Sequence, residues 1–469
     1  MKKSIIKQVK LLILSVSTLL LAFTSQAATM ADYFTDNGFG NSVAYSPGVH
    51  HGNVTYITYQ GPKENPWVAS YNHKTKKWAG PYRAGHSILG DGDVTKIDNH
   101  GRPSLVVDKA GYIHVFYGGH GGDTALHGAN PLGNTHSGEM RHRVSKNPYD
   151  ISSWRTLDNI PPFGTYTQAL AMGNGDIFLF YRHGAHSSDW VYSRSTDNGI
   201  TFEPPVSVLK SEKIPSDKQT DNTHTHNWYM TVHKTANDRI DFAFNYHAEN
   251  RPHDVERRDG YYMYMKTWGR VFKNVKNEKL TMPIKKDYAD RKALVVKTAS
   301  NKWSNGPKVV LDRKGWPHIT LNEGADDGSK SGGPKTLRYY RWDGNAQKWT
   351  NNSDASLPGG RGIMDVDWPR NATMLIAGKV NGVGKVVRWK TSNGGKTFTA
   401  GETVYNGGSG SMDISDEIVD SHPDARYVLV DRTSKDYVNL ILLGNNGIIK
   451  RVKSEASKLS AAQKAEPKL

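Results

Sequence analysis

Short runs of alternating apolar and polar residues recur along the chain from Val43 to Leu443, and Gly, Asp, Asn and Pro bound most of them. Apolar residues recur at helical spacing almost nowhere in this range. Alternation with a period of two is typical of strands that turn one face toward a core. The pattern therefore predicts an all-β fold.

The turns between these runs resemble one another. The segment Val107–Val115 (VDKAGYIHV) is echoed by Leu311–Ile319 (LDRKGWPHI). A second turn, STDNGITF at Ser195–Phe202, is matched by TSNGGKTF at Thr391–Phe398. This second type resembles the Asp-box of sialidase-type propellers, a hairpin turn in which an acidic or amide side chain caps backbone N–H groups.

Irregular repetition of four-stranded units is the signature of a β-propeller, and at roughly 50 to 65 residues per unit about seven blades fit the chain. Trp78, Trp154 and Trp349 follow similar turns, so we expect aromatic residues to pack between neighbouring sheets. A multidomain β-sandwich is the alternative, but no Pro/Ser-rich linker divides the chain. We predict one seven-bladed β-propeller of four-stranded antiparallel blades over residues 28–449, and a basic, frayed tail over residues 450–469.

Residues 1–27 have the pattern of a secretory signal peptide. Four lysines precede an apolar stretch, Leu11–Phe23, which is too short to span a bilayer, and Ser25–Ala27 is a small-residue cleavage site. We expect cleavage after Ala27 and a secreted protein, extracellular or periplasmic, without a membrane partner. The chain has no cysteine, which excludes thiolate zinc sites and a cysteine nucleophile and fits a core that is large enough without disulfides.

The formal charge is +16, and it falls to +12 when the four lysines of the signal peptide are left out. A basic secreted protein suggests a polyanionic partner. Nucleic acid is disfavoured because the sequence has no RNP, helix-turn-helix or zinc-finger motif. With 12 Trp and 23 Tyr to stack on sugar rings, an anionic polysaccharide is the better expectation. We expect the protein to be a monomer.

The segment Thr95–Gly122 predicts a β-hairpin with His100 and His120 at its two outer ends. Because the ends of a hairpin return to the same edge of a sheet, these two imidazoles should lie near each other. Imidazoles can accept or donate protons near neutral pH. His114, by contrast, has a counterpart in His318 within the repeated turn, and this repetition favours a structural role.

Tyr166 and Arg182 occupy matching ends of the next predicted hairpin. An arginine that opens a Gly-rich loop is suited to bind a carboxylate bidentately. Tyr229, at the start of a third strand pair, could close the same pocket, although a packed strand tyrosine is the alternative. The longest irregular insert, Gly121–Pro148, follows the first hairpin, and we expect it to be a functional loop at the binding face.

Two further pairs of histidines, His224/His226 and His247/His253, could hold zinc together with a carboxylate or water. Neither spacing is diagnostic of a metal site. A structural metal therefore stays one alternative beside ordinary surface histidines.

Three segments together carry a family resemblance: DNHGRPSLVVDKAGYIHVFYGGH, GTYTQALAMGNGDIFLFYRHG and NWYMTVHKTANDRIDFAFNYH. Their order resembles that of the secreted propeller polysaccharide lyases that degrade ulvan, the sulfated uronate-rhamnose polysaccharide of green algae. The resemblance is close from Asp91 to Thr267 and continues beyond as a blade pattern. It implies a seven-bladed fold and β-elimination at a uronic acid linked through O4 to a sulfated rhamnose.

The resemblance also implies roles for individual residues. By position, His100, His120, Tyr166 and Arg182 match the family's catalytic and carboxylate-binding residues, and Tyr229 matches a substrate-binding residue less securely. Some relatives hold a structural metal with Cys and His. This chain lacks Cys, which puts such a zinc or calcium site in doubt, although His247 matches one ligand.

The chemistry of β-elimination requires this set of residues. The uronate carboxylate must be neutralised before the C5 proton can leave, and Arg182 would supply the charge, with His120 and Tyr229 as hydrogen-bond partners. His100 and Tyr166 would act as base and acid, in an order that the sequence leaves open. The elimination requires no cofactor. The alternatives are a noncatalytic glycan-binding propeller and a sialidase-like glycoside hydrolase, which would need a pair of acidic residues or a Tyr-Glu nucleophile pair.

Overall fold

The computed structural model describes residues 28–39, 43, 46–91, 98–213, 225–248, 257–327, 333–351, 357–408, 410–432 and 437–457. The predicted signal peptide, His224 and His253 lie outside these residues, so the structure does not test the predictions made for them.

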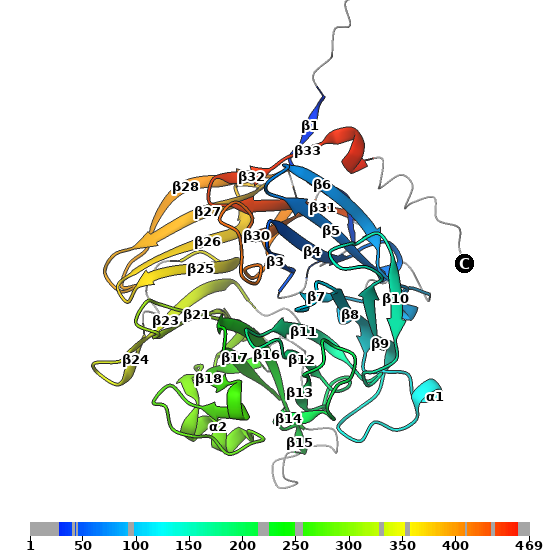
Figure 1. The fold of residues 1–469 in the computed structure, drawn as a ribbon. Coiled ribbons are helices and arrows are strands. Elements are labelled where there is room, and N and C mark those ends of the chain that lie inside the picture. Colours follow the sequence, from blue (N-terminus) through cyan, green and yellow to red (C-terminus); the bar gives the residue numbers. More distant parts are fainter. Residues whose placement is uncertain are drawn as a thin grey trace, which may run out of the picture.

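Seven antiparallel sheets, formed by the described part of the chain, surround a central axis like the blades of a propeller (Figure 1). This confirms the predicted fold and the number of blades. Most blades have four strands, and the fourth has six. In blade order the strands are β3 (Gly48–His51), β4 (Val54–Gln60), β5 (Pro66–Asn72) and β6 (Lys77–Arg83); β7 (Ser104–Val107), β8 (Ile113–His120), β9 (Ser137–Ser145) and β10 (Trp154–Leu157); β11 (Thr165–Ala171), β12 (Ile177–Arg182), β13 (Trp190–Ser195) and β14 (Val206–Leu209); β15 (Glu212–Lys213), β16 (Thr225–Ala236), β17 (Arg239–Ala248), β18 (Arg257–Lys266), β19 (Val271–Lys273) and β20 (Leu294–Val296); β21 (Lys302–Leu311), β22 (Pro317–Ala325), β23 (Lys335–Asp343) and β24 (Lys348–Asn351); β25 (Arg361–Trp368), β26 (Asn371–Val380), β27 (Val383–Thr391) and β28 (Thr399–Asn406); and β29 (Ser411–Ile414), β30 (Tyr427–Arg432), β31 (Tyr437–Gly444) and β32 (Gly447–Ile449).

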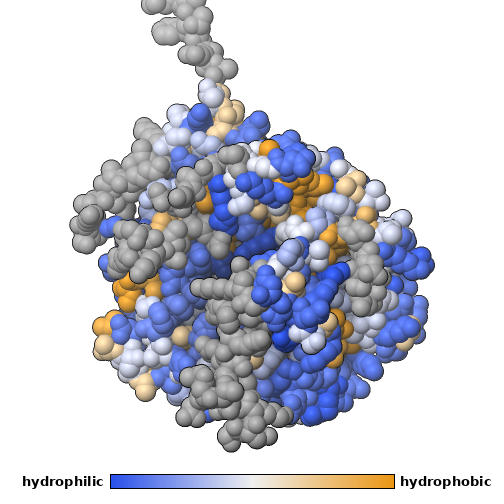
Figure 2. Space-filling view, turned by 180° about the vertical axis from the view of Figure 1, so that it is seen from behind, coloured by the Kyte–Doolittle hydropathy of each residue, from blue (hydrophilic) through white to orange (hydrophobic). Residues whose placement is uncertain are grey.

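Helices are few and short in the described residues, which agrees with the lack of helical periodicity. They are η1 (Pro62–Glu64), η2 (Ile88–Asp91), α1 (Thr124–His127), η4 (Trp268–Arg270) and α2 (Lys286–Lys292), together with a helical turn at residues 453–457. None of them has the length and apolar character that crossing a membrane requires. The face of the molecule in Figure 2 is mostly hydrophilic and is hollowed near its middle.

The two ends of the chain close the ring. Strand β2 (Thr35–Phe39) pairs with β31 and so completes the seventh blade, and β1 (Met30–Ala31) pairs with β33 (Arg451–Val452). The buried Arg451 donates to the carbonyls of Phe34 and Gly80 at 3.1 and 2.7 Å. The fold therefore continues past residue 449, and the tail that we expected to be frayed from residue 450 begins with an ordered strand.

Aromatic residues at blade ends pack between neighbouring sheets, as predicted. Trp78 of the first blade stacks on Phe34 with ring centroids 5.1 Å apart, and Phe34 immediately precedes the strand that completes the seventh blade. Trp349 of the fifth blade contacts Tyr262 of the fourth at 5.9 Å. Trp154 packs against a buried cluster drawn from the first and second blades. These rings fill the wedge-shaped space that opens between twisted sheets.

The repeated turns are built alike. Asp197 Oδ1 accepts hydrogen bonds from the Thr201 N–H at 3.0 Å and from the Ser195 hydroxyl at 2.8 Å. At the corresponding turn, Asn393 Oδ1 accepts from the Thr397 N–H at 3.2 Å. The acidic or amide side chain therefore caps the turn, as the sequence pattern predicts.

The other repeated motif contains the two histidines that were expected to be structural. Both are buried, and each lies beside the aspartate of its own turn: His114 Nε2 is 3.3 Å from Asp108 Oδ2, and His318 Nε2 is 3.2 Å from Asp312 Oδ2. The repetition thus reflects one local hydrogen-bonding arrangement used twice.

The irregular insert after His120 is shorter than predicted. It contains the short helix α1 and ends at His136, because β9 pairs with β8 along its length. Alternate residues of β9 are buried, which is the period of a half-buried strand. The second half of the predicted insert is therefore part of the second blade.

Candidate active site

One carboxylate joins the two histidines at the outer ends of the first hairpin. Asp98 Oδ1 lies 2.5 Å from His100 Nδ1, and Asp98 Oδ2 lies 2.6 Å from His120 Nδ1. The two imidazole rings stack with centroids 3.6 Å apart and planes 7° apart. The predicted proximity of His100 and His120 is confirmed. Because each Nδ1–H donates to Asp98, each Nε2 is left to act on a substrate.

The first blade holds Asp98 in position. The Asp98 N–H donates to Glu64 Oε1 at 2.7 Å, and its carbonyl accepts from Gln60 Nε2 at 2.8 Å. Both supporting side chains are buried. Burial raises the pKa of Glu64 to about 7. The carboxylate that orients the two histidines is thus fixed by side chains from a neighbouring blade.

Burial and hydrogen bonding determine the protonation states of Asp98 and His100. Burial lowers the pKa of His100 to about 4, against the opposing effect of Asp98. Burial also disfavours ionisation of Asp98, but the hydrogen bonds from His100 and His120 outweigh it and hold the pKa of this carboxyl well below its usual range. At neutral pH the arrangement is therefore an ionised Asp98 and a neutral His100 that can accept a proton at Nε2.

Tyr166 has an unusual backbone conformation at the start of β11. Its φ is +59°, a left-handed value that is a genuine outlier for a bulky residue. The Tyr166 N–H donates to the carbonyl of His100 at 3.0 Å, and the two side-chain rings lie 5.1 Å apart. The strained backbone therefore brings the phenol beside the first hairpin's histidine.

Arg182 ends the partner strand β12, opposite Thr165. Its side chain is fully buried, and neither Nη1 nor Nη2 has a hydrogen-bond partner among the described residues. The guanidinium carbon lies 5.0 Å from the ring centroid of Tyr166 and 5.8 Å from that of Tyr229. A buried cation without an anionic partner is costly, so this site is suited to receive an anion.

Tyr229 on β16 closes the same site from the fourth blade. Its ring is 5.9 Å from that of Tyr166, and the guanidinium of Arg257 lies 4.2 Å from its centroid. The buried Tyr229 hydroxyl has no hydrogen-bond partner in the described part of the chain. Tyr229 therefore lines the same cavity as Tyr166, the first of the two alternatives left open by the sequence.

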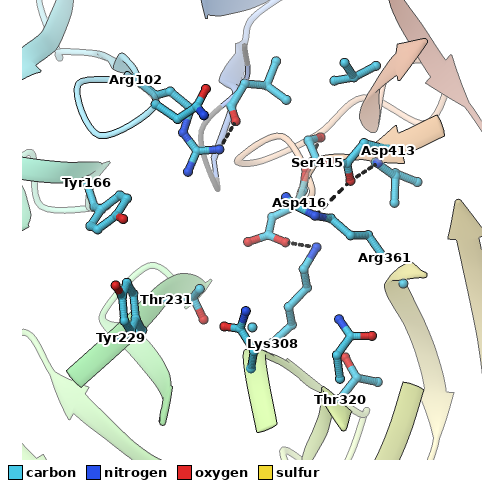
Figure 3. Close-up of a pocket in the computed structure, with 18 of the residues that line it drawn as sticks. Arg102, Tyr166, Tyr229, Thr231, Lys308, Thr320, Arg361, Asp413, Ser415 and Asp416 are labelled. Carbon is cyan, nitrogen blue, oxygen red and sulfur yellow. Dashed lines mark hydrogen bonds and ion pairs between the residues drawn. The ribbon is translucent and has the colours of Figure 1, made fainter. Parts of the chain in front are cut away.

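A cavity of about 340 Å³ opens at the centre of the ring beside these residues (Figure 3). His100, Tyr166 and Tyr229 line it, whereas His120 and Arg182 are absent from the lining and lie against the residues that form it. The other charged residues of the lining are Arg102, Arg257, Lys308, Arg361, Arg432, Asp413 and Asp416. Cations outnumber carboxylates, so the cavity favours an anionic ligand.

The two carboxylates of the cavity are engaged in ion pairs. Asp416 Oδ1 lies 2.5 Å from Lys308 Nζ, and Asp413 contacts Arg361 at 3.2 Å (Figure 3) and Arg432 at 3.1 Å. Paired carboxylates of this kind orient the surrounding cations. They lie across the cavity from Tyr166 and Tyr229 (Figure 3).

Two groups of side chains in the described residues have the composition and spacing to hold a metal ion. One is Asp98, His100 and His120, and the other is His73, His422 and Asp424. Neither includes His247, which is buried on β17 with its ring 5.6 Å from Tyr229. Since His224 and His253 are not described, the metal site predicted at His247 remains a prediction.

Sequence reasoning missed Asp98, Gln60 and Glu64. Asp98 could have been found, because an aspartate two residues before a histidine can reach its Nδ1. Gln60 and Glu64 had no such signal, since they precede the hairpin by more than thirty residues and belong to another blade.

Three comparisons relate the chain to known proteins. Residues 54–356 match the model of the BNR repeat-containing family. The chain is 44% identical over 447 residues to an ulvan lyase of Nonlabens ulvanivorans, covering 92% of this chain and 93% of that one. It is 43% identical over 435 residues to the PL25 ulvan lyase of Pseudoalteromonas sp. strain PLSV, covering 89% and 87%.

Solved structures agree with the sequence relatives. A PL25 ulvan lyase superposes with a TM-score of 0.85 at 42% identity, covering 92% of this chain and 99% of that one. A second structure of such an enzyme, bound to -[GlcA(1-4)Rha3S]-, gives a TM-score of 0.85 at 41% identity, with the same coverage.

Proposed function

The chain belongs to the ulvan lyases, within the BNR repeat-containing family, and from this premise we propose that it cleaves ulvan by β-elimination at the uronic acid. It is a polysaccharide lyase, and its substrate is an anionic sulfated polysaccharide. The observation that carries the mechanism is the contact of a neutral, Asp98-bound His100 with Tyr166, beside the buried guanidinium of Arg182, whose Nη1 and Nη2 have no hydrogen-bond partner among the described residues.

In the first step the uronate carboxylate is neutralised. Arg182 supplies the positive charge, because its Nη1 and Nη2 groups are buried and have no partner among the described residues. The hydroxyl of Tyr229 donates a hydrogen bond to the same carboxylate, and His120 is its further hydrogen-bond partner. These contacts strengthen as negative charge moves from C5 onto the carboxylate, so they lower the barrier to proton removal.

In the second step the C5–H bond breaks and its proton passes to His100 Nε2. The electron pair is delocalised onto the carboxylate and then forms the C4–C5 double bond as the C4–O4 bond breaks. Tyr166 donates its phenolic proton to the departing O4. The products are an unsaturated uronate end and a free hydroxyl on the rhamnose side. His100 and Tyr166 exchange these roles if a uronate epimer presents its C5 proton on the opposite ring face.

The test is the appearance of the conjugated double bond, followed by ultraviolet absorbance during incubation with ulvan. We expect product with the wild type and a loss of about 100-fold or more in kcat for His100→Asn and for Tyr166→Phe. Reducing ends without ultraviolet absorbance would instead identify a hydrolase. Binding of ulvan without either product would identify a noncatalytic glycan-binding propeller.

The elimination uses protein side chains alone, so we propose that it needs no cofactor. Treatment with a chelator should leave the initial rate unchanged. A loss of rate that zinc or calcium restores would contradict this and would support a metal near the site, with His247 as the predicted ligand.

We also propose that the protein is exported, acts as a monomer and has neither a membrane nor a nucleic acid as its partner. Strand β1 starts at Met30, so removal of residues 1–27 would leave every described strand intact. N-terminal sequencing of the secreted protein should give Ala28 as the first residue, and an uncleaved N-terminus would contradict this. Size-exclusion chromatography with light scattering should give the mass of one chain.

A further inference from the structure

A second cluster of histidines lies where the first and seventh blades meet. His50 is on β3, and His73 follows β5, both in the first blade. His422 and Asp424 come from the segment between β29 and β30 of the seventh blade. Backbone hydrogen bonds join this segment to β3, since the His50 N–H donates to the Val419 carbonyl at 2.9 Å. The cluster thus spans the closure of the ring.

This cluster is separate from the catalytic residues. It lies beside two turns, the one between β3 and β4 and the one after β5. A hydrogen bond of 2.8 Å from the His73 N–H to the Asn53 carbonyl joins these two turns. His100 and Tyr166 lie at the opposite ends of the corresponding strands, just before β7 and at the start of β11. A ligand bound here would not enter the catalytic cavity, whose lining contains none of these residues.

The rings of the cluster are closely packed. His73 and His422 stack with centroids 3.7 Å apart, and the His50 ring lies 5.3 Å from the first and 5.2 Å from the second. One candidate ligand atom from each of His73, His422 and Asp424 lies within 4.8 Å of the others. The donor atoms of a tetrahedral zinc lie about 3.4 Å apart, so binding requires only a small contraction.

The hydrogen bonds leave specific atoms available. His73 Nε2 lies 2.9 Å from the Thr55 hydroxyl, whereas its buried Nδ1 has no hydrogen-bond partner among the described residues, and the side chain is only 8% exposed. Asp424 Oδ1 accepts from Asn446 Nδ2 at 2.8 Å, and Oδ2 lies 3.9 Å from His422 Nδ1. Because His422 Nδ1 accepts from the Asp424 N–H at 3.1 Å, His422 Nε2 is the ring nitrogen that can bind a metal. A buried imidazole nitrogen without a partner is costly and points to a missing ligand.

From this geometry we infer that His73, His422 and Asp424 form a zinc site that links the first blade to the seventh. Two imidazoles and one carboxylate are a donor set suited to zinc, and one carboxylate supplies too few oxygens for calcium. A fourth position is left for water or for the neighbouring His50. Because the ligands come from both sides of the seam, bound zinc stabilises the closed ring.

The experiment measures zinc content and thermal stability of the full mature protein after chelator treatment and reloading with Zn²⁺. The test variants are His422→Ala, in a half-buried position, and the milder Asp424→Asn. His51→Ala is the matched control, because His51 is an exposed neighbour of His50 on β3 that lies outside the cluster. His100→Asn controls for zinc bound by the catalytic histidines.

We expect the wild type, His51→Ala and His100→Asn to retain about one zinc that the two test variants lose. Zinc at a hundredfold excess over Kd should raise the Tm of the first three by about 3 °C or more and leave the test variants unchanged. Initial lyase rates should be the same with and without zinc for the wild type and for His422→Ala.

Equal zinc content in the wild type and in both test variants would overturn the site, as would an unchanged wild-type Tm. Loss of zinc in His100→Asn alone would assign the metal to the catalytic histidines and would also overturn it. If His422→Ala fails to fold, Asp424→Asn decides the outcome, together with the visible absorption of Co²⁺ in the wild type, which should be that of a tetrahedral nitrogen and oxygen site.

Discussion

At the scale of single residues, Asp98 determines what the two stacked histidines can do. It accepts Nδ1–H from both rings and so leaves both Nε2 atoms available, although their local surroundings differ. His100 lines the cavity and lies against Tyr166, whereas His120 stacks behind it against His136. In the proposed mechanism, this one carboxylate orients His100 to take a proton and His120 to contact the substrate's carboxylate.

Substitution of Asp98→Asn should lower kcat by about 10²–10⁴-fold, because an amide cannot accept from both rings and the tautomers become unrestrained. Steady-state kinetics on ulvan would measure the loss. Asp91→Asn is the matched control, since the exposed Asp91 binds His86 at 2.9 Å outside the site. Similar rates for Asp98→Asn and the wild type would show that the carboxylate does not orient the histidines.

The pH dependence should report the neutral state of His100. The base must be unprotonated, so kcat/KM should be constant above the lowered pKa of about 4 and fall tenfold per pH unit below it. If His100 had its ordinary pKa of 6.5, the enzyme would already have lost half its kcat/KM at pH 6.5. Rates measured at constant ionic strength separate the two cases, and an acid limb near 6.5 would contradict the assignment of His100 as base.

Arg182 should be required for activity but not for stability. Arg182→Met removes a buried cation that lacks hydrogen-bond partners at Nη1 and Nη2, so the free energy of unfolding should stay unchanged or rise while the rate falls at least about 100-fold. Urea unfolding and kinetics on the same preparation test both parts.

The control for stability is Arg239→Met. Arg239 makes two hydrogen bonds of 2.9 Å to the buried Asp241, and loss of one partner of such a pair costs about 3–5 kcal/mol. If Arg182→Met destabilises the protein as much as Arg239→Met, then Arg182 serves the fold rather than an anionic substrate.

At the scale of elements, the same side-chain cap occurs in two turns of the chain. Asp197 in the β13–β14 connection and Asn393 in the β27–β28 connection make matching bonds to the N–H four residues later. Both connections need a side-chain acceptor two residues after the strand's final Ser or Thr. Because the requirement is local, it is visible in the sequence as a repeated motif.

Substitution of Asp197→Ala should lower the free energy of unfolding by about 1–2 kcal/mol, since the turn loses its acceptor. Asp197→Asn should cost only a few tenths, because Asn393 fills the same position in the other turn. Chemical denaturation measures both values, and the lyase rate should not change. Equal stabilities for the two variants would mean that the cap does not stabilise the turn.

At the scale of the whole molecule, the ring depends on contacts between the two ends of the chain. Phe34 is fully buried at this closure, stacked on Trp78 and 6.1 Å from the ring of Tyr59. Strand β2, which follows Phe34, pairs with β31, and Arg451 donates a hydrogen bond to the Phe34 carbonyl. The first and seventh blades therefore share one core.

Substitution of Phe34→Ala should destabilise the protein by about 3–5 kcal/mol, the usual cost of a cavity left by a buried aromatic ring. Leu126→Ala is the control, because Leu126 is 63% exposed on α1 and its loss should stay within about 0.5 kcal/mol. Thermal and urea unfolding would measure the difference. A small effect of Phe34→Ala would show that the closure does not limit stability.

The sequence by itself determined the strands, the seven-bladed class and the pairing of site residues within each hairpin. His100 with His120, and Tyr166 with Arg182, could be predicted because a hairpin returns its two ends to one edge, and this geometry depends on local periodicity and turn residues alone. The structural role of His114 followed from the same logic, since a repeated local bond leaves a repeated motif.

Only the tertiary structure decided which hairpins meet and which side chains support them. Glu64 and Gln60 of the first blade contact Asp98, which precedes the second blade. Tyr229 of the fourth blade contacts Tyr166 of the third. His422 of the seventh blade stacks on His73 of the first, where the ring closes. These contacts join residues far apart in the chain. They depend on the twist of the sheets and on side-chain rotamers, which leave no periodic trace in the sequence.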